Sequence, residues 1–193
     1  MGIIRTREEN NCKITLWETT ETLKELLQLS HIKEVPDFNT EKRKKEWLSI
    51  RILLKKISPN TTLSYNKYGS PKLDNENYIS ISHSQGLIAI IISKQQVGLD
   101  IEEISEKALR VAAKFISKNN LKALTNEKAT LIWCCKEAIY KWNQKGGVDF
   151  IADIKLHPFK NMKKGEITAE FKDSQLILHY QKIHNHYLVY VCK

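Results

Sequence analysis

The sequence of 193 residues has few residues that break regular structure, with 7 Gly, 4 Pro and only 8% aromatic residues. Because 41% of its residues are hydrophobic, this scarcity of loop-forming residues excludes an intrinsically disordered chain. Long apolar runs are also missing, since the longest aliphatic stretch, Leu87–Ile92, is far shorter than the about 20 residues that span a bilayer. We therefore expect a soluble globular protein with no membrane-spanning segment.

Cysteine is scarce as well: the chain contains Cys12, Cys134, Cys135 and Cys192. These residues lack the spacing of metal ligands and include an adjacent pair, so we expect neither a disulfide framework nor a zinc site. The charged segment 5–9 stands where an export signal would need apolar residues. Together these observations predict a cytoplasmic protein.

Acidic residues are the less numerous charged class, with 22 Asp and Glu against 31 Lys and Arg and a net charge of +9. This excess favours polyanionic partners, which include nucleic acids, anionic membranes, phosphorylated cofactors and acidic proteins. The Lys-rich segment 42–56 makes a nucleic-acid-binding module one alternative. Because helix-turn-helix, zinc and RNA-recognition patterns are missing, we expect no nucleic-acid partner.

The hydrophobic periodicity predicts both strands and helices. Strands are expected at 12–18, 61–66, 78–83, 87–93 and 97–101, and in the alternating tail from residue 151 onward. Helices are expected at 19–29, 41–57, 105–115 and 126–142. Thr40 is the expected cap of the second helix, and Gly146-Gly147 is expected to end the last one. In the tail, turns are expected at 163–165, 172–173 and 184–185.

The two long helices resemble each other, because Trp47, Arg51 and Lys55 have the same spacing as Trp133, Glu137 and Lys141. We predict an α+β fold of two similar halves related by a pseudo-twofold axis. Each half has a long helix packed on a small, mostly antiparallel sheet. The predicted halves are residues 1–95 and 96–193, with the active site at the seam between them. A chance alignment of two charged helices is the alternative.

Two carboxylates, Asp100 and Glu102, stand at alternate positions of the expected strand at 97–101 and just beyond it, and therefore project from the same face. Aligned carboxylates repel one another unless a cation neutralises them, and Mg²⁺ prefers one or two carboxylates together with phosphate oxygens. Taken alone, the segment is more typical of an edge strand whose polar face meets solvent.

Glu137 and Lys141 lie one turn apart on the expected helix at 126–142. They are either a surface ion pair or a third metal carboxylate with a phosphate-binding lysine beside it. Ser82 and His83, at the end of the strand at 78–83, can donate hydrogen bonds to phosphate oxygens. Since adjacent strand residues point to opposite faces, these two cannot form a nucleophilic hydrolase pair.

In this order, Ser-His-Ser at 82–84, Val-Gly-Leu-Asp-Ile-Glu at 97–102 and Trp-Cys-Cys-Lys-Glu-Ala-Ile-Tyr-Lys at 133–141 resemble the 4′-phosphopantetheinyl transferase superfamily. The chain length and suspected duplication resemble its pseudodimeric, surfactin-synthetase-activating type. The resemblance implies transfer of the phosphopantetheine arm of coenzyme A to a serine of an acyl or peptidyl carrier protein. It further implies Mg²⁺, with Mn²⁺ as a substitute, and release of 3′,5′-ADP.

The resemblance assigns Asp100, Glu102 and Glu137 to the metal, and gives Glu137 a second role in activating the carrier serine. It assigns Lys141 to catalysis and, with Ser82 and His83, to the phosphates. These assignments agree with the chemistry of phosphoryl transfer, in which an enzyme positions groups and neutralises charge. The positive net charge suits an acidic carrier protein, and we expect a monomer that binds neither nucleic acid nor a membrane.

The resemblance also places Lys42 and Arg43 at the coenzyme A site, whereas Arg51 is interpreted as a structural counterpart of Glu137. The chain departs from the family in having Gly69-Ser70-Pro71 where a lysine or arginine commonly stands between Gly and Pro. We hypothesise that Lys72 supplies part of the missing cation. An inactive relative that acts as a scaffold is a further alternative, although all three acidic positions are occupied.

Overall fold

The computed structural model describes residues 2, 4–122 and 124–193. Its strands are β1 (Ile4–Glu9), β2 (Cys12–Glu18), β3 (Leu63–Tyr65), β4 (Pro71–Leu73), β5 (Tyr78–Ser84), β6 (Leu87–Ser93), β7 (Val97–Glu103), β8 (Ile154–Leu156), β9 (Lys164–Phe171), β10 (Ser174–Ile183) and β11 (His186–Cys192). Its α-helices are α1 (Leu23–Ser30), α2 (Glu41–Ile57), α3 (Glu106–Arg110) and α4 (Asn126–Asn143), and short 3₁₀ helices occur at Ala112–Lys114 and Lys118–Asn120.

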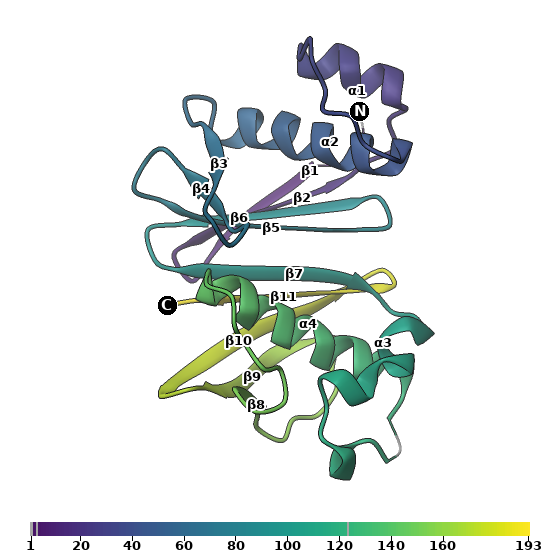
Figure 1. Cartoon of the computed structure of the whole chain (residues 1–193), viewed down its shortest axis with the longest axis vertical. Coiled ribbons are helices and arrows are strands. Elements are labelled where there is room, and N and C mark those ends of the chain that lie inside the picture. The colour runs from purple at the N-terminus through teal and green to yellow at the C-terminus, as the bar shows by residue number, and fades with distance from the viewer. Residues whose placement is uncertain (1, 3, 123) are drawn as a thin grey trace.

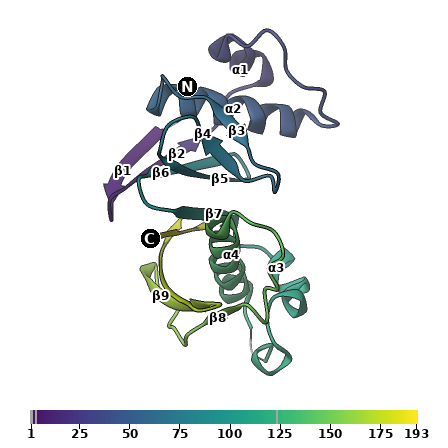
Figure 2. The same ribbon diagram turned by 60° about the vertical axis from the view of Figure 1, so that its left-hand side comes forward.

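Two antiparallel sheets meet in the middle of the molecule, and the long helices lie outside them (Figure 1). The first sheet has the order β1-β2-β6-β5 and packs on α2. The second has the order β7-β11-β10-β9-β8, and Figure 2 shows it curving around α4. The α+β fold with mostly antiparallel sheets is confirmed. The pseudo-twofold relation and the division between residues 95 and 96 stay predictions.

Three hydrophobic clusters follow from the alternation of residues along the central strands. In β6, Ile88 and Ile90 pack toward α2, whereas Ala89 and Ile91 pack toward the second sheet. In β7, the odd-numbered residues 97, 99 and 101 join the cluster between the sheets, while α4 and strands β8–β11 enclose the third cluster. Because successive strand residues face opposite sides, the even-numbered residues of β7 are directed toward α4.

Both long helices begin at a threonine cap. The side chain of Thr40 accepts a hydrogen bond from Arg43 N at 3.3 Å, which confirms the predicted start of α2. Thr125 does the same for Lys128 N at 3.2 Å. The predicted end of α4 was wrong in detail: the left-handed residue that terminates it is Gln144 (φ 54°), and the two glycines follow later. A left-handed residue just after a helix satisfies its last carbonyls, and non-glycine residues sometimes take this position.

Two further predictions are corrected by the structure. The helix expected at 105–115 ends at Arg110, because Val111 leaves helical geometry (φ −106°, ψ 10°) and the chain then turns Phe115 into the core. The turn expected at 163–165 is largely strand, since β9 starts at Lys164 and pairs Gly165 with Tyr180. The turns expected at 172–173 and 184–185 are confirmed.

The expectation of no disulfide is contradicted as well. Cys12 of β2 and Cys192 of β11 form a disulfide between the two sheets, across a sequence separation of 180. Cys134 and Cys135 are free and buried in α4. The spacing of cysteines along a chain does not show which of them the fold brings together, so this pairing could not be read from the sequence.

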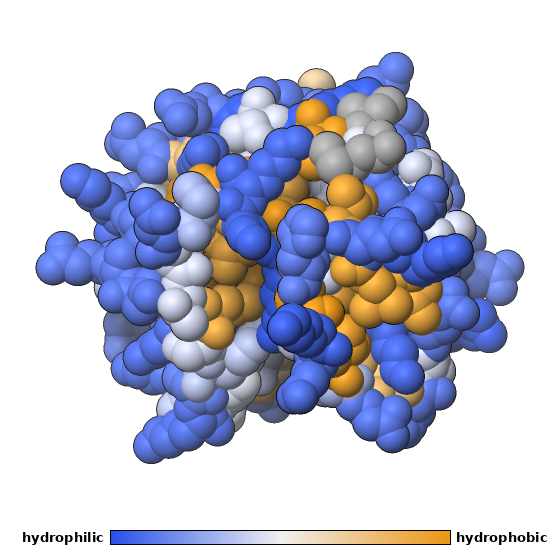
Figure 3. Space-filling model, turned by 90° about the horizontal axis from the view of Figure 1, so that it is seen from above, coloured by the Kyte–Doolittle hydropathy of each residue, from blue (hydrophilic) through white to orange (hydrophobic). Residues whose placement is uncertain are grey.

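The end of the molecule formed by α1 and α2 presents mainly hydrophilic side chains, with hydrophobic patches between them (Figure 3). Leu27 and Leu29 of α1 are among the large hydrophobic residues that remain exposed. Within the described residues, no helix combines the length and the apolar character that crossing a membrane requires.

Candidate active site

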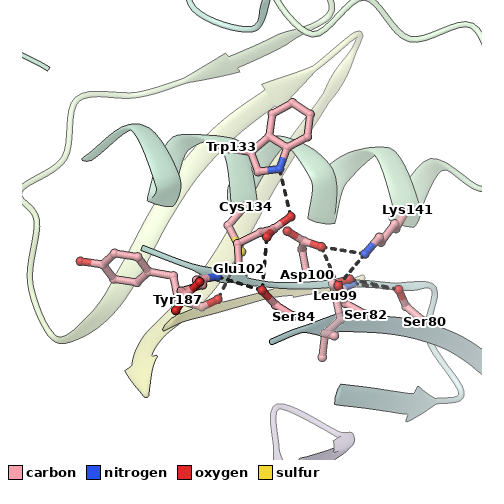
Figure 4. A network of polar contacts seen from close by, with 11 residues as sticks. Ser80, Ser82, Ser84, Leu99, Asp100, Glu102, Trp133, Cys134, Lys141 and Tyr187 are labelled. Atoms are coloured by element: carbon pink, nitrogen blue, oxygen red, sulfur yellow. Dashed lines mark hydrogen bonds and ion pairs between the residues drawn. The ribbon is translucent and has the colours of Figure 1, made fainter. Parts of the chain in front are cut away.

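Gly98 allows β7 to lie directly against α4. A Cβ atom at this position would overlap the carbonyl oxygen of Ala138 and would lie 2.5 Å from the backbone nitrogen of Trp142. Only a residue without a side chain permits so close a backbone approach. The close contact brings the carboxylates of the next even-numbered residues, Asp100 and Glu102, beneath the side chains of α4 (Figure 4).

Asp100 is the centre of the site, with a relative exposure of only 3%. Its Oδ1 atom accepts hydrogen bonds from Lys141 Nζ and from Ser82 Oγ, both at 2.7 Å. Lys141 Nζ also donates to Ser82 Oγ at 2.9 Å, which closes a triangle among the three residues. Burial is the largest single influence and acts to lower the pKa of Lys141, but the charge of Asp100, its hydrogen bond and the charge of Glu137 together raise that pKa. Lys141 is therefore a fixed cation at the seam between the sheets.

Glu102 and Glu137 complete an acidic cluster around Asp100. Burial, followed by repulsion from Asp100, raises the pKa of Glu102, although a hydrogen bond from Trp133 opposes this shift. Burial and the charge of Asp100 raise the pKa of Glu137 to about 7, despite the opposing charge of Lys141. Such shifts arise when carboxylates share a desolvated space without enough positive charge.

The donor set of this cluster fits a hard divalent cation. Oδ2 of Asp100 is buried and has no hydrogen-bond partner among the described residues, so it is free to bind a cation. Oxygen ligands of this kind suit Mg²⁺ or Mn²⁺. The described part of the chain holds no group of three His, Cys, Asp or Glu side chains close enough to enclose a metal ion. The joint role of Asp100, Glu102 and Glu137 as ligands therefore stays a prediction.

A pocket of about 350 Å³ opens between α2 and the β5–β6 hairpin, and we name it the basic pocket after its lysines, Lys42 and Lys45. Two carboxylates also line it, and its other polar lining residues are neutral or weakly basic: Glu41 and Glu46, then Thr19, Ser49, His83 and Gln85. His83 Nδ1 lies 3.3 Å from Glu46 Oε1. Partial burial lowers the pKa of His83; Glu46 opposes this, and nearby cations, Lys141 among them, add to it. The hydroxyl oxygens of Ser49 and Thr19 are buried in the wall of the pocket and lack hydrogen-bond partners within the described residues.

The structure brings most of the predicted site residues together. Ser82 and His83, on opposite faces of β5, connect the acidic cluster with the basic pocket, because Ser82 contacts Asp100 whereas His83 lies beside Glu46. Arg43 lies close enough to His83 to affect its pKa. Lys72 is exposed on β4 and lines a different hollow, of about 190 Å³, with Tyr78 and Gln144.

β7 is an edge strand, the first in the order of its sheet, but the expectation that its polar face meets solvent is wrong, because Asp100 is buried. The sequence analysis also missed Lys45 and Ser49, which follow Lys42 at i+3 and i+7 and so share its face of α2. That spacing was a usable signal. The guanidinium group of Arg51 stacks on the ring of Trp47, with its carbon 3.5 Å from the ring centroid. This contact holds Arg51 against its own helix, α2.

A larger cavity, of about 520 Å³, lies elsewhere, under the other side of α4. Its lining includes Lys128 and Lys136, and none of the acidic residues described above. The amine of Lys128 donates to Phe159 O at 2.9 Å, and that of Lys136 donates to Phe150 O and to Ile154 O. Because these two lysines are already bound to the backbone, we assign the site to the seam.

Comparison with known proteins identifies the family of the chain. The family model described as "4'-phosphopantetheinyl transferase superfamily" matches residues 96–192, which contain β7 and α4. The chain therefore belongs to the 4′-phosphopantetheinyl transferase superfamily. It is also similar to "4'-phosphopantetheinyl transferase gsp" of Aneurinibacillus migulanus, with 33% identity over 97 residues. That match covers 46% of this chain and 41% of the relative, less than half of each.

Proposed function

We propose that the protein transfers the 4′-phosphopantetheine arm of coenzyme A to a serine of an acyl or peptidyl carrier protein. The observation that carries this proposal is that β5 joins two sites: Ser82 contacts Asp100 and Lys141, while His83 lines the basic pocket. A substrate with several phosphates and a reactive pyrophosphate needs both a cationic cradle and a site that neutralises charge during transfer.

In this proposal the basic pocket holds the adenosine phosphates of coenzyme A. Lys42 and Lys45 supply positive charge for charge-assisted hydrogen bonds to the phosphates. Arg43, beside His83, adds to the attraction. Lys141 and Ser82 then lie at the pyrophosphate, where Lys141 balances charge that develops on the leaving group.

The carrier serine attacks the phosphorus that bears pantetheine. The new bond joins serine oxygen to this phosphorus, and the bond to the second phosphate breaks and releases 3′,5′-ADP. Glu137, with a pKa of about 7, is suited to take the serine proton at neutral pH. Asp100, Glu102 and Glu137 would hold Mg²⁺ or Mn²⁺, which would polarise the pyrophosphate oxygens.

The kind of carrier protein and the oligomeric state follow from the net charge and from a site built by one chain. A net charge of +9 favours encounter with an acidic carrier protein. Since both sides of the seam come from one chain, we infer a monomer that works as a pseudodimer. We infer a cytoplasmic location from coenzyme A as the substrate. The Cys12–Cys192 disulfide is unusual in a reducing compartment, and its state is therefore worth measuring.

The test is incubation of the protein with coenzyme A, Mg²⁺ and a panel of apo carrier proteins, followed by intact mass measurement of each carrier. We expect the mass of at least one carrier to rise by the phosphopantetheine arm, and no change when coenzyme A is omitted or EDTA is added. If no carrier is modified, the activity is absent and the inactive-scaffold alternative takes its place.

A further inference from the structure

Strands β5 and β7 lie side by side, although they belong to different sheets. β5 is the last strand of the order β1-β2-β6-β5, and β7 is the first of the order β7-β11-β10-β9-β8 (Figure 1). No strand pairing joins β5 to β7 in the described part of the chain. Backbone groups on the facing edges of two such strands need other partners when they are buried.

Three serines of β5 provide these partners. Ser80, Ser82 and Ser84 alternate along the strand and therefore point to the same side, toward β7 (Figure 4). Ser80 Oγ accepts a hydrogen bond from Leu99 N, and Ser84 Oγ accepts one from Glu103 N, both at 3.0 Å. Together with the contact of Ser82 to Asp100, these bonds form a serine ladder that joins the two sheets.

The outer serines also lie next to the acidic cluster. The hydroxyl of Ser84 donates to Glu102 Oε2 at 3.5 Å, while Trp133 Nε1 donates to Glu102 Oε1 at 3.3 Å. Glu102 is thus held from both sides, by β5 and by α4. At the other end of the ladder, Ser80 fixes residue 99, the neighbour of Asp100, and is itself only 2% exposed.

We propose that Ser80 and Ser84 are positioning residues that hold β7 in register with β5 and thereby aim Asp100 and Glu102 at the bound cation. The effect of these two serines on catalysis rests on the proposed function. A hydroxyl group can accept from a backbone N–H and donate to a second group at the same time. Alanine can do neither, so Ser80→Ala leaves the buried N–H group of Leu99 without its partner, and Ser84→Ala does the same to the partly buried N–H group of Glu103.

The first test observes the ladder directly in the protein without substrate. Hydrogen exchange of the Glu103 amide should become about tenfold faster or more in Ser84→Ala, and that of the Leu99 amide in Ser80→Ala. The matched control is Ser93→Ala, which removes a buried serine of the neighbouring strand whose hydroxyl donates to Asn11 O. Unchanged exchange at both amides would overturn the ladder.

The second test separates positioning from general stability. Mn²⁺ binding, measured by electron paramagnetic resonance with coenzyme A present, should weaken by about tenfold or more in Ser84→Ala. The kcat value should fall similarly, while KM for coenzyme A changes less than about twofold, because Ser84 does not line the basic pocket. Ser84→Thr keeps the hydroxyl and suits a strand, so it should restore both values.

Ser80 is more deeply buried, and Ser80→Ala is therefore judged only by exchange and by its melting temperature relative to Ser93→Ala. Wild-type affinity for Mn²⁺ in Ser84→Ala, or failure of Ser84→Thr to restore it, would overturn the positioning role. A wild-type protein that modifies no carrier would overturn the proposed function instead, and the exchange experiment would still decide whether the ladder exists.

Discussion

Lys141 Nζ lies 2.7 Å from Asp100 Oδ1, so the lysine of α4 pairs with a carboxylate of β7. The helical spacing had predicted Glu137, one turn away, as its neighbour. In the structure Glu137 lies close enough for its charge to raise the pKa of Lys141, but the direct contact belongs to Asp100. This pair joins the two elements that carry the site, and it has consequences for stability that a surface pair would not have.

Removal of Asp100 should destabilise the fold. Asp100→Ala leaves the ammonium group of Lys141 and the hydroxyl group of Ser82 without their shared acceptor. Water replaces that acceptor poorly, because the side chain of Lys141 is only 25% exposed in the folded protein. We expect a loss of about 1–3 kcal/mol in the free energy of unfolding. Urea denaturation is the measurement. The double variant Asp100→Ala/Lys141→Met should recover part of the loss, and a single variant as stable as the wild type would contradict the structure.

Glu137 should make stability depend on pH in the opposite direction to an ordinary carboxylate. Its pKa in the folded protein is about 7, above the ordinary value of 4.5. Between these values the folded protein binds a proton that the unfolded chain has lost, so the free energy of unfolding decreases as pH rises through this interval. Well above pH 7 the free energy of unfolding no longer changes with the titration of Glu137, because the group is ionised in both the folded and the unfolded state.

Glu137→Gln should therefore equal the wild type near pH 4.5 and exceed its stability by about 1–3 kcal/mol near pH 8, in urea titrations without added metal. The same variant should lose most transferase activity, because an amide neither accepts a proton nor binds a cation as a carboxylate does. Lower stability than the wild type near pH 8 would show that Glu137 is not under the repulsion described above.

Any side chain at residue 98 should disrupt the site. Gly98→Ala would force β7 and α4 apart, because the new Cβ overlaps the backbone of Ala138. We expect destabilisation of about 3 kcal/mol or more, together with loss of activity. The matched control is Gly146→Ala, whose Cβ would meet Tyr68 at an ordinary 3.5 Å. Equal melting temperatures for the two variants would contradict the close approach.

The disulfide between Cys12 and Cys192 can be tested by counting thiols. The unfolded protein should show two reactive thiols without reductant and four after reduction, because Cys134 and Cys135 are free. Reduction should lower the free energy of unfolding by about 2–4 kcal/mol, since the bond restricts the unfolded chain. Four thiols in freshly purified, unreduced protein would show that the bond does not form in solution.

The elements could be predicted where the sequence carries a strong local signal. Thr40 before a periodic segment predicts α2, and the two runs of strand-forming residues on both sides of residues 84–86 predict the β5–β6 hairpin. β1 could not be predicted in this way, because Ile4–Glu9 is an edge strand rich in charged residues that resembles a polar terminus.

The residues of the site could be predicted from their order in the chain, but their contacts could not. Neither the pairing of Lys141 with Asp100 nor the roles of Ser80 and Ser84 follow from local spacing, because each contact joins elements that are distant in the sequence. Alternation of serine along β5 was nevertheless visible, and it indicates a polar face on a strand whose other face is apolar.

The basic pocket makes a prediction that separates its lysines from Lys72. Lys42 and Lys45 line the pocket, whereas Lys72 is exposed beside a different hollow. A contact between a lysine and a phosphate contributes about 1.5–3 kcal/mol when it is well formed. Lys42→Ala and Lys45→Ala should each raise KM for coenzyme A by about tenfold, with kcat changed much less, because they act on bound substrate rather than on the reacting atoms.

Lys72→Ala is the matched control, and we expect its KM to stay within about twofold of the wild type. Steady-state kinetics with one carrier protein at saturation provide the measurement. If Lys72→Ala raised KM more than Lys42→Ala, coenzyme A would bind along β4 rather than between α2 and the β5–β6 hairpin, and Lys72 would supply the cation that is missing at Ser70.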